Sequence, residues 1–270
     1  MSGNGGSQSG RSVASKVGSI LVAFLPASRE LSLNELALRA GLPLTTTYRL
    51  ASELVEWGAL ERGEAGGYRV GLRLWEIGSL ATRGATVREV AVPYMQDLYE
   101  ATHENIQLAV LAGREALYIE KISGRKATPI RTRRGGRLPL HATGVGKVLL
   151  AYSPRDFLEN VLDAGLKRYT PHTIVLPGLL TRTLTDIRRN GVGFAKEELT
   201  MGTVSVAAPV FNNRGDVVAA MSIVSRSSRA DLRRLAPAVR TAAIGASREL
   251  RNRPAEDDAA PVNPRRAAAP

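Results

Sequence analysis

The sequence predicts an α+β protein of two domains, in which a small helical domain with a β-hairpin precedes a larger α/β domain. Three observations support this fold class. Two short amphipathic helix patterns flank a Gly-Leu-Pro turn within residues 32–57. Two short strand patterns then surround a glycine-rich turn at 63–67. From residue 105 to residue 250, strand patterns and helix patterns succeed one another.

The composition excludes several classes of protein. A chain of 270 residues with 44% hydrophobic residues is long enough to bury two cores. No apolar run approaches the roughly 20 residues that span a bilayer, and the Gly/Ser-rich N-terminus lacks the apolar segment of a signal peptide. Cysteine is absent, and the three histidines lie far apart. We therefore expect a cytoplasmic protein without a membrane partner, a metal site or a cofactor.

The net charge of +12 favours a polyanionic partner such as DNA. Most of the basic excess, however, lies after Arg83, beyond the helix pair and the hairpin. The charge by itself therefore does not predict where a polyanion binds. That prediction rests on the local pattern of the N-terminal domain.

The N-terminal elements have recognisable boundaries. After a polar leader at 1–11, which we expect to be disordered, a first helix runs over 13–25 with its apolar residues on one face. Ser32 and Glu35 have the spacing of a capping box, which predicts the start of a second helix. Gly41 permits a tight turn, and the proline two residues later prevents that helix from continuing.

The third helix begins at Leu44 or Thr45 and ends near Trp57. Its inward positions follow helical spacing and are Thr47, Leu50, Ala51 and Leu54. We expect the Thr47 hydroxyl to bond a backbone carbonyl one turn earlier. The residues on or beside the outer face are Thr45, Thr46, Tyr48, Arg49 and Ser52. Together with the hairpin, this arrangement predicts a winged helix-turn-helix over residues 12–71.

A winged helix-turn-helix places one helix in the major groove of DNA. The N–H groups at the start of the third helix, together with the hydroxyls of Thr45 and Thr46, suit a phosphate. Arg49 is long enough to reach a guanine edge or a phosphate, and Tyr48 can contact a base or the backbone. We therefore predict that the five outer-face residues bind double-stranded DNA. The alternative is a small helical bundle whose outer polar residues are only solvated.

The pattern changes twice beyond the hairpin. Residues 72–103 contain two helix patterns, which we expect to link the domains and to carry a dimer contact. Residues 104–252 form the second domain, and its strand patterns include 106–113, 116–122, 128–133 and 192–198. The Ala/Pro-rich tail at 253–270 is expected to be disordered.

Several motifs together give the chain a specific resemblance. The N-terminal part resembles the N-terminal domain of the IclR family of bacterial transcriptional regulators. The motifs that carry this resemblance are LSLNELALRAGLPLTTTYRLASELVEWGALER and YRVGLRLWEIG. The C-terminal part resembles that family's effector-binding domain. The motifs that carry this second resemblance are GGRLPLHATGVGKVLLAYSP, RYTPHTI and KEELTMGTVSVAAPVFNNRGDVVAAMSIV. The resemblance covers about residues 11–251, and its motifs occur in the family's order.

The resemblance implies both a fold and a function. It implies a GAF-like α/β sensor domain and a homodimer or homotetramer that binds a palindromic operator. Two copies of the third helix then contact two half-sites about one DNA turn apart. We accordingly expect a ligand-responsive transcriptional repressor that is controlled by a small organic-acid effector.

The resemblance also implies which residues bind the effector. Family members that bind small organic acids use the start of the GVGK helix and polar residues of the later strands. Carried over by position, these residues are Leu138, Thr143, Gly144, Val145, Lys196, Ser205, Ser222 and Val224. Gly144 and Gly146 let the backbone approach a ligand closely, and the free N–H groups at the start of this helix can hold a carboxylate.

This chain departs from the family pattern at several positions. Lys196 stands where an acidic residue is common, Ser205 where cysteine is common, and Val224 where a serine can occur. We therefore expect a larger or aromatic organic acid. Leu44 stands where the family often has arginine, so Arg49 is expected to carry more of the DNA recognition. The alternative for the pocket is that its serines bond only their neighbours and that the lysine faces water.

A rival interpretation is an enzyme, or a nucleotide-binding sensor, with an incidental helix-turn-helix. The GVGKV segment fails as a phosphate loop because position 141 is histidine and position 148 is valine. The sequence contains no Gly-x-Ser-x-Gly motif. We expect His141 to be a hydrogen-bonded structural residue, and Glu197 and Glu198 to point to opposite faces of a strand. The prediction is therefore that the chain is not an enzyme.

Overall fold

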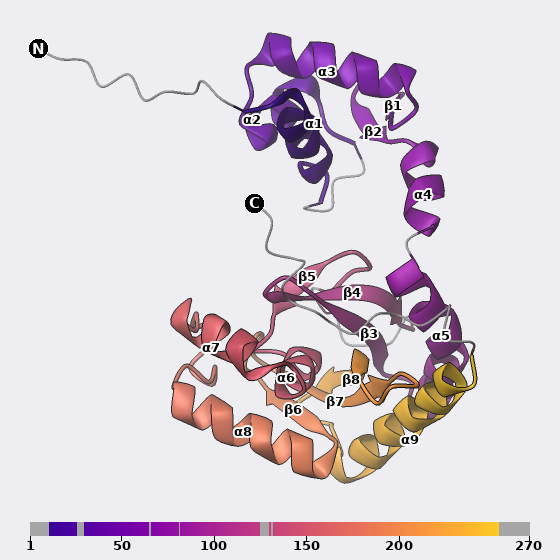
Figure 1. Cartoon of the computed structure of the whole chain (residues 1–270). Coiled ribbons are helices and arrows are strands. Elements are labelled where there is room, and N and C mark those ends of the chain that lie inside the picture. Colours follow the sequence, from indigo (N-terminus) through magenta and orange to yellow (C-terminus); the bar gives the residue numbers. More distant parts are fainter. Residues whose placement is uncertain are drawn as a thin grey trace, which may run out of the picture. The chain divides into compact units, whose positions relative to one another are not determined.

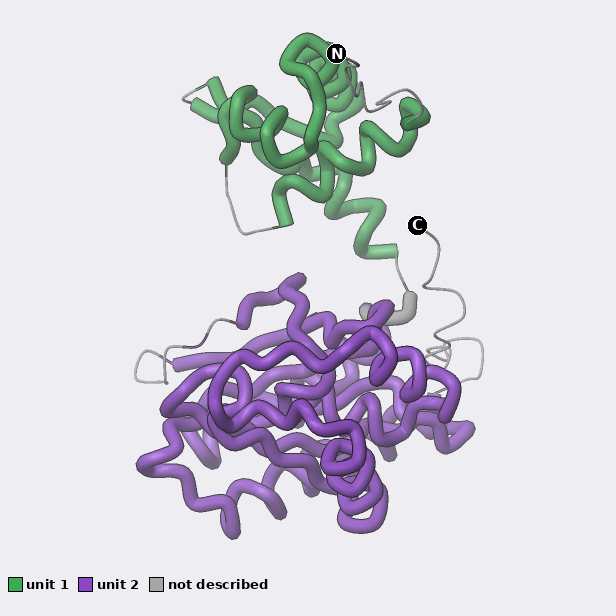
Figure 2. The backbone as a smooth tube through the Cα atoms, turned by 90° about the vertical axis from the view of Figure 1, so that its left-hand side faces the viewer, with its two compact units in different colours: residues 1–81 green, residues 82–270 purple. Residues whose placement is uncertain are grey.

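The computed structural model describes residues 11–25, 30–64, 66–80, 82–124, 130 and 132–253. The chain divides into two compact units, residues 1–81 and 82–270 (Figure 2). Each unit buries hydrophobic residues of its own. The predicted leader and tail lie outside the described residues, apart from Arg11 and Arg253.

The first unit has the predicted winged helix-turn-helix fold (Figure 1). Its elements are α1 (Val13–Val22), α2 (Leu33–Ala40), α3 (Leu44–Glu56), β1 (Leu60–Arg62), β2 (Tyr68–Val70) and α4 (Leu72–Ser79). Helices α1 to α3 and the hairpin share one core, which includes Ile20, Leu36, Leu50 and Tyr68. Because this core is shared, the hairpin is held at a defined position beside α3.

The turn between α2 and α3 forms as the sequence predicts. The Ser32 hydroxyl accepts a bond from the Glu35 N–H, and the Glu35 carboxylate accepts one from the Ser32 N–H at 2.9 Å, which confirms the capping box. Helix α2 ends at Gly41, whose φ of 61° is left-handed. The Thr47 hydroxyl donates to the Pro43 carbonyl at 3.0 Å, so the predicted bond to the preceding turn is confirmed.

The second unit is a six-stranded antiparallel sheet with helices on both faces. Its elements are α5 (Thr82–Thr102), β3 (Asn105–Ala112), β4 (Glu115–Ile122), β5 (Arg137–Pro139), α6 (Gly144–Ala151), α7 (Arg155–Asp163), α8 (Pro177–Asn190), β6 (Gly193–Lys196), β7 (Thr203–Phe211), β8 (Val217–Arg226) and α9 (Leu232–Arg251). The strand order is β5-β4-β3-β8-β7-β6. Helices α5 and α9 pack on one face, whereas α6, α7 and α8 pack on the other (Figure 1). This is the α/β domain that the sequence predicts.

The two helices of the range 72–103 fall in different units. Helix α4 lies in the first unit, whereas α5 lies in the second. Val90 and Met95 of α5 are buried in the same core cluster as Val239 of α9. Helix α5 is therefore a structural part of the α/β domain, because its apolar side is covered by that domain's sheet and by α9.

One predicted strand does not form in the described residues, and another ends earlier than the pattern indicates. The described residues of 128–133 lie outside any strand, and β5 forms only after a turn at Gly135, where φ is 75°. That turn pairs with Tyr118 of β4 through two backbone hydrogen bonds. Strand β6 stops at Lys196 because the next residue, Glu197, has a left-handed φ of 56°.

Candidate DNA-binding and effector-binding sites

The predicted DNA-contacting residues all lie on α3. Thr45, Tyr48 and Arg49 are exposed, whereas Thr46 and Ser52 are half-buried. The opposite side of the helix, with Thr47, Leu50, Ala51 and Leu54, is buried in the domain core. No described side chain caps the first turn of α3, so its N–H groups are available to a phosphate. The geometry therefore presents an outer face that a duplex can contact.

Arg49 forms an ion pair within α3. Its Nη1 lies 2.8 Å from Oε1 of Glu53, one turn further along the helix. Both side chains are more than half exposed, so this pair contributes little to stability and exchanges readily with solvent. The guanidinium is therefore free to leave Glu53 for a guanine edge or a phosphate.

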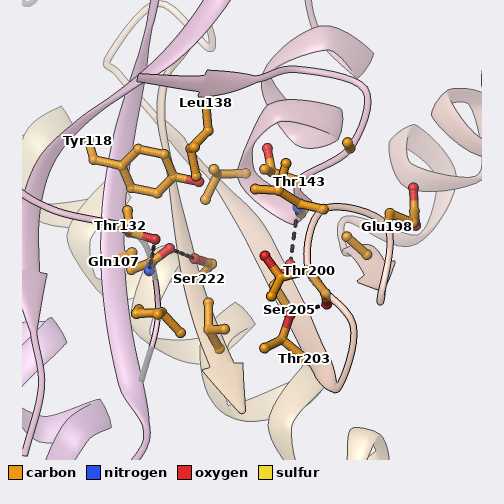
Figure 3. Close-up of a pocket in the computed structure, with 17 residues that line it drawn as sticks. Gln107, Tyr118, Thr132, Leu138, Thr143, Glu198, Thr200, Thr203, Ser205 and Ser222 are labelled. Carbon is orange, nitrogen blue, oxygen red and sulfur yellow. Dashed lines mark hydrogen bonds between the residues drawn. The ribbon is translucent and has the colours of Figure 1, made fainter. Parts of the chain in front are cut away.

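A cavity of about 360 Å³ lies in the second unit, between the sheet and the start of α6 (Figure 3). Hydroxyl and amide side chains line it together with aliphatic ones, and a tyrosine ring forms part of its wall. The lining residues are Gln107, Tyr118, Ile130, Thr132, Leu138, Ala142, Thr143, Gly144, Val145, Ala195, Glu198, Leu199, Thr200, Thr203, Ser205, Ser222 and Val224. A cavity of this size and mixed polarity suits a small organic ligand.

The structure brings most of the predicted effector-binding residues together in this cavity. Those that line it are Leu138, Thr143, Gly144, Val145, Ser205, Ser222 and Val224. Lys196 does not line it: this side chain is exposed and lies in a separate surface depression with His172 and Glu197. The reason is that successive side chains of a strand point to opposite faces of the sheet. Ala195 faces the cavity, so Lys196 points to the opposite face.

The start of α6 is held against the sheet by hydroxyl groups. Thr143 Oγ1 accepts a bond from the Gly146 N–H at 3.1 Å, and Ser205 Oγ accepts one from the Gly144 N–H at 3.1 Å. A Cβ at Gly146 would lie 2.5 Å from Cα of Leu140, so glycine is required there. Ser205 therefore bonds α6 rather than a strand neighbour, and Val145, for whose N–H the helix offers no acceptor, lines the cavity.

A buried ion pair lies directly behind the helix start. Lys147 Nζ lies 2.5 Å from Oε1 of Glu198, and the two side chains are only 1% and 7% exposed. Burial lowers the pKa of Lys147, although the Glu198 charge opposes that shift. Glu198 Oε2 has no hydrogen-bond partner within the described residues. The cavity wall thus contains the Glu198 carboxylate, whereas the Lys147 ammonium group that pairs with it does not line the cavity.

Comparison with known proteins assigns both domains to one family. Residues 13–64 match the family profile "IclR helix-turn-helix domain", and residues 80–248 match "Bacterial transcriptional regulator IclR C-terminal". The chain belongs to the IclR family of bacterial transcriptional regulators. The resemblance inferred from the motifs is therefore confirmed.

Named IclR-family relatives cover most of this regulator. It is 34% identical over 214 residues to the HTH-type transcriptional regulator XynR of Escherichia coli, covering 78% of this chain and 85% of XynR. It is 32% identical over 200 residues to the HTH-type transcriptional repressor AllR of the same organism, covering 73% and 74%. An IclR homologue from Microbacterium hydrocarbonoxydans, solved with 4-hydroxybenzoate, superposes with a TM-score of 0.85 at 33% identity, covering 90% of this chain and 100% of that one.

Part of the cavity of this IclR-family regulator was not predicted from the sequence. Gln107, Tyr118 and Thr132 line it but were not among the predicted residues. One signal for Gln107 is present in the sequence, since it is the only polar residue in the apolar strand pattern IQLAVLAG. Burial raises the pKa of the Tyr118 hydroxyl, which keeps it neutral as a hydrogen-bonding group.

The loop that follows β6 is fixed from a distant segment. Thr170 Oγ1 donates to the Glu197 carbonyl, and Thr173 Oγ1 donates to the Glu198 carbonyl, both at 2.7 Å. The RYTPHTI motif therefore positions the loop that completes the cavity wall. The two glutamates do diverge, but they do so in this loop and not in a strand: Glu197 accepts a bond from Ser227, whereas Glu198 pairs with α6.

His141 has the structural role that was predicted for it. Its Nε2 lies 2.9 Å from the Lys167 carbonyl, to which it donates, and the residue is buried. Within the described part of the chain, no group of three potential ligands could hold a metal ion. No helix in the described ranges combines the length and apolar composition needed to cross a membrane.

A charged cluster supports the wall segment that contains Thr132. Glu120 of β4 is almost fully buried and pairs with Arg88 of α5 and Arg134, each at 2.5 Å. Lys121 Nζ donates to the Thr132 carbonyl at 2.9 Å. The segment that forms one side of the cavity is thereby tied both to the sheet and to α5.

This cluster predicts a loss of stability in acid. Burial raises the pKa of Glu120, but the Lys121 N–H and the guanidinium groups of Arg134 and Arg88 lower it by more. The pKa of this carboxyl therefore lies below its ordinary value of 4.5. The contribution of ionised Glu120 to the free energy of unfolding is therefore present above pH 4.5. It is lost as the pH falls towards the pKa of Glu120 in the folded state. Urea unfolding of Glu120→Gln and the unchanged protein should differ most near neutral pH and converge below pH 4.5. A difference that stays constant across this range would contradict the assignment.

Proposed function

We propose that this protein is a ligand-responsive transcriptional repressor that binds a palindromic operator as a dimer or tetramer and carries out no catalysis. The observation that carries the proposal is the combination, in a chain of this family, of an exposed α3 face and a ligand-sized cavity at the start of α6. A repressor of this kind acts in the cytoplasm, where its operator is accessible. The name of the relative AllR supports the repressor assignment.

Self-association is supported by the surface of α4. This helix has no buried residue, and its large apolar side chains Leu72, Trp75 and Ile77 are exposed, as is the following Leu80. Trp75 is 69% exposed and Leu80 is 77% exposed. Apolar groups gathered at this density on one short helix favour contact with a second copy of the chain. A second copy supplies the second α3 that a palindromic operator needs.

The proposed effector is a small organic acid, and an aromatic one fits best. Among the described lining residues none carries a positive charge, because Lys147 is behind the wall and is paired with Glu198. A carboxylate is then held at the start of α6 by the Val145 N–H and the Ser205 hydroxyl, because the Gly144 and Gly146 N–H groups already have acceptors. The apolar walls and the Tyr118 ring accommodate a flat ring. The solved relative that holds 4-hydroxybenzoate supports this class of ligand.

The effector acts through a difference in affinity between two arrangements of the dimer. If the acid binds one arrangement better than the other, it shifts the population and changes the spacing of the two α3 helices. An acid that bound both arrangements equally would leave operator affinity unchanged.

Two measurements test this function. A gel shift with the DNA upstream of the protein's own gene should show a saturable complex that a suitable acid weakens. A thermal shift with a set of aromatic and aliphatic carboxylic acids should raise the melting temperature of the α/β domain for at least one of them. Failure of every acid to raise it would remove the support for an acid effector. Turnover of any acid or nucleotide in a parallel screen would support the enzyme instead.

A further inference from the structure

The effector cavity has a second polar end, away from the start of α6. Gln107 on β3 and Ser222 on β8 are directly paired across the two central strands, and Thr132 lies beside them. Figure 3 displays these three side chains together on one side of the cavity, with Thr143 and Ser205 on the other. The two polar groups come from different elements and are separated by the ligand space.

The amide of Gln107 has hydrogen-bonding capacity to spare. It is 2% exposed and lines the cavity, so its remaining polar sites can be reached only from the ligand space. Its Nε2 donates to Thr132 Oγ1 at 2.9 Å, and its Oε1 accepts from Ser222 Oγ at the long distance of 3.5 Å. A primary amide has two N–H donors and two acceptor lone pairs. One donor and one lone pair therefore lack a partner within the described residues, at a position that lines the cavity.

The space between the two polar ends is largely apolar. Leu138, Val145 and Val224 line it, and the Tyr118 ring forms part of its wall. A ligand that fills this space meets the helix start with its Val145 N–H and the Ser205 hydroxyl at one end, and the Gln107 amide with the Ser222 hydroxyl at the other. Aliphatic and aromatic surface lies between them. An acid whose far end is purely apolar would cover the Gln107 amide without satisfying it, which costs binding energy.

We propose that Gln107 is a specificity-determining residue that selects acids with a hydrogen-bonding substituent, such as a hydroxyl, at the end opposite the carboxylate. This inference rests on the proposed acid effector and specifies its class. The hydroxyl donates to Gln107 Oε1 or accepts from its free N–H, and Ser222 lies close enough to complete the arrangement. The carboxylate stays at the start of α6.

Isothermal titration with two acids tests the inference. The unchanged protein is titrated with 4-hydroxybenzoate and with benzoate, which differ only by the hydroxyl. We expect about tenfold tighter binding of the hydroxylated acid, the loss expected when one buried hydrogen bond is left unmade. In Gln107→Leu this preference should disappear, with the Kd of benzoate changed by less than about twofold. A purely structural role for the glutamine would weaken both acids equally.

Matched variants separate selection from damage to the fold. Ser222→Ala alters the same polar end while leaving the glutamine in place, and it should reduce the preference partially. Thr200→Val changes a hydroxyl residue that lines the cavity elsewhere, and it should keep the preference intact. If Gln107→Leu does not fold, as judged by its melting temperature, Ser222→Ala carries the test.

The outcomes distinguish this inference from the proposed function. Equal affinity of the unchanged protein for both acids overturns the role of Gln107 but leaves an acid effector standing. A preference that survives intact in Gln107→Leu and in Ser222→Ala also overturns it. Failure of every hydroxylated acid in the thermal-shift set to bind overturns the inference, and failure of every acid in the set overturns the acid effector as well.

Discussion

Replacing Lys147 with methionine is expected to destabilise the α/β domain by about 3–5 kcal/mol, because it leaves the Glu198 carboxylate buried without a cation. The two side chains are 1% and 7% exposed, so bulk solvent replaces the lost partner poorly. The remaining bond to Glu198 Oε1, from the Lys196 N–H at 3.3 Å, is too long to compensate. The free energy of unfolding of this domain is the quantity to measure.

Urea unfolding of the full chain provides that measurement with an internal reference. Both tryptophans, Trp57 and Trp75, lie in the first unit, so their fluorescence follows that unit alone. The far-ultraviolet circular dichroism also follows the sheet and helices of the second unit. In Lys147→Met we expect the second transition to move to lower urea while the tryptophan transition stays in place.

The double variant Lys147→Met/Glu198→Gln is the matched control. The glutamine keeps an acceptor for the Lys196 N–H but removes the uncompensated charge, so most of the lost stability should return. If the single variant is as stable as the unchanged protein, the pair is not the buried contact inferred here. If the double variant is no better than the single one, the loss comes from packing and not from the charge.

Arg49→Ala is expected to weaken binding to the specific operator by about 1–3 kcal/mol, or roughly tenfold to a hundredfold. Arg49 is the long cation on the outer face of α3, and its pair with Glu53 costs little to break. Gel shift or fluorescence anisotropy at one fixed salt concentration measures the effect. A base contact would lower operator affinity more than affinity for unrelated DNA, whereas a phosphate contact would lower both.

Arg155→Ala is a matched control for this substitution. Arg155 on α7 forms the same kind of exposed ion pair, with Glu159 one turn further along at 3.0 Å. Its removal lowers the net charge equally but lies in the α/β domain, so operator affinity should change by less than twofold. Equal losses in the two variants, or no loss in Arg49→Ala, would refute the assignment of Arg49 to the DNA interface.

Local spacing was sufficient to predict the first unit. Ser32 and Glu35 interact three residues apart, and Gly41 ends α2 through its own backbone conformation. The Thr47 bond to Pro43 spans four residues. Each of these contacts is decided within one or two helical turns, so the residues that make it can be seen together in the sequence.

The cavity was only partly predictable, since alternation along a strand depends on where the strand ends. Ser205, Ser222 and Val224 were found at positions that do face the ligand space, whereas Lys196 was assigned to the wrong side. The sequence pattern carried β6 on to Glu198, and it gave no sign that Glu197 turns out of the strand with a left-handed φ.

The sequence by itself determined the two-domain fold, the outer face of α3 and the helix of the GVGK segment, because these depend on short-range periodicity and turn residues. Only the tertiary structure decided which distant groups meet: Gln107 with Ser222 across two strands, and Lys147 with Glu198 across a helix and a loop. The physical reason for the first contact is the strand order β4-β3-β8-β7, in which β3 pairs with β8 although the paired residues lie more than 100 positions apart in the sequence. Spacing along the chain carries no record of that pairing.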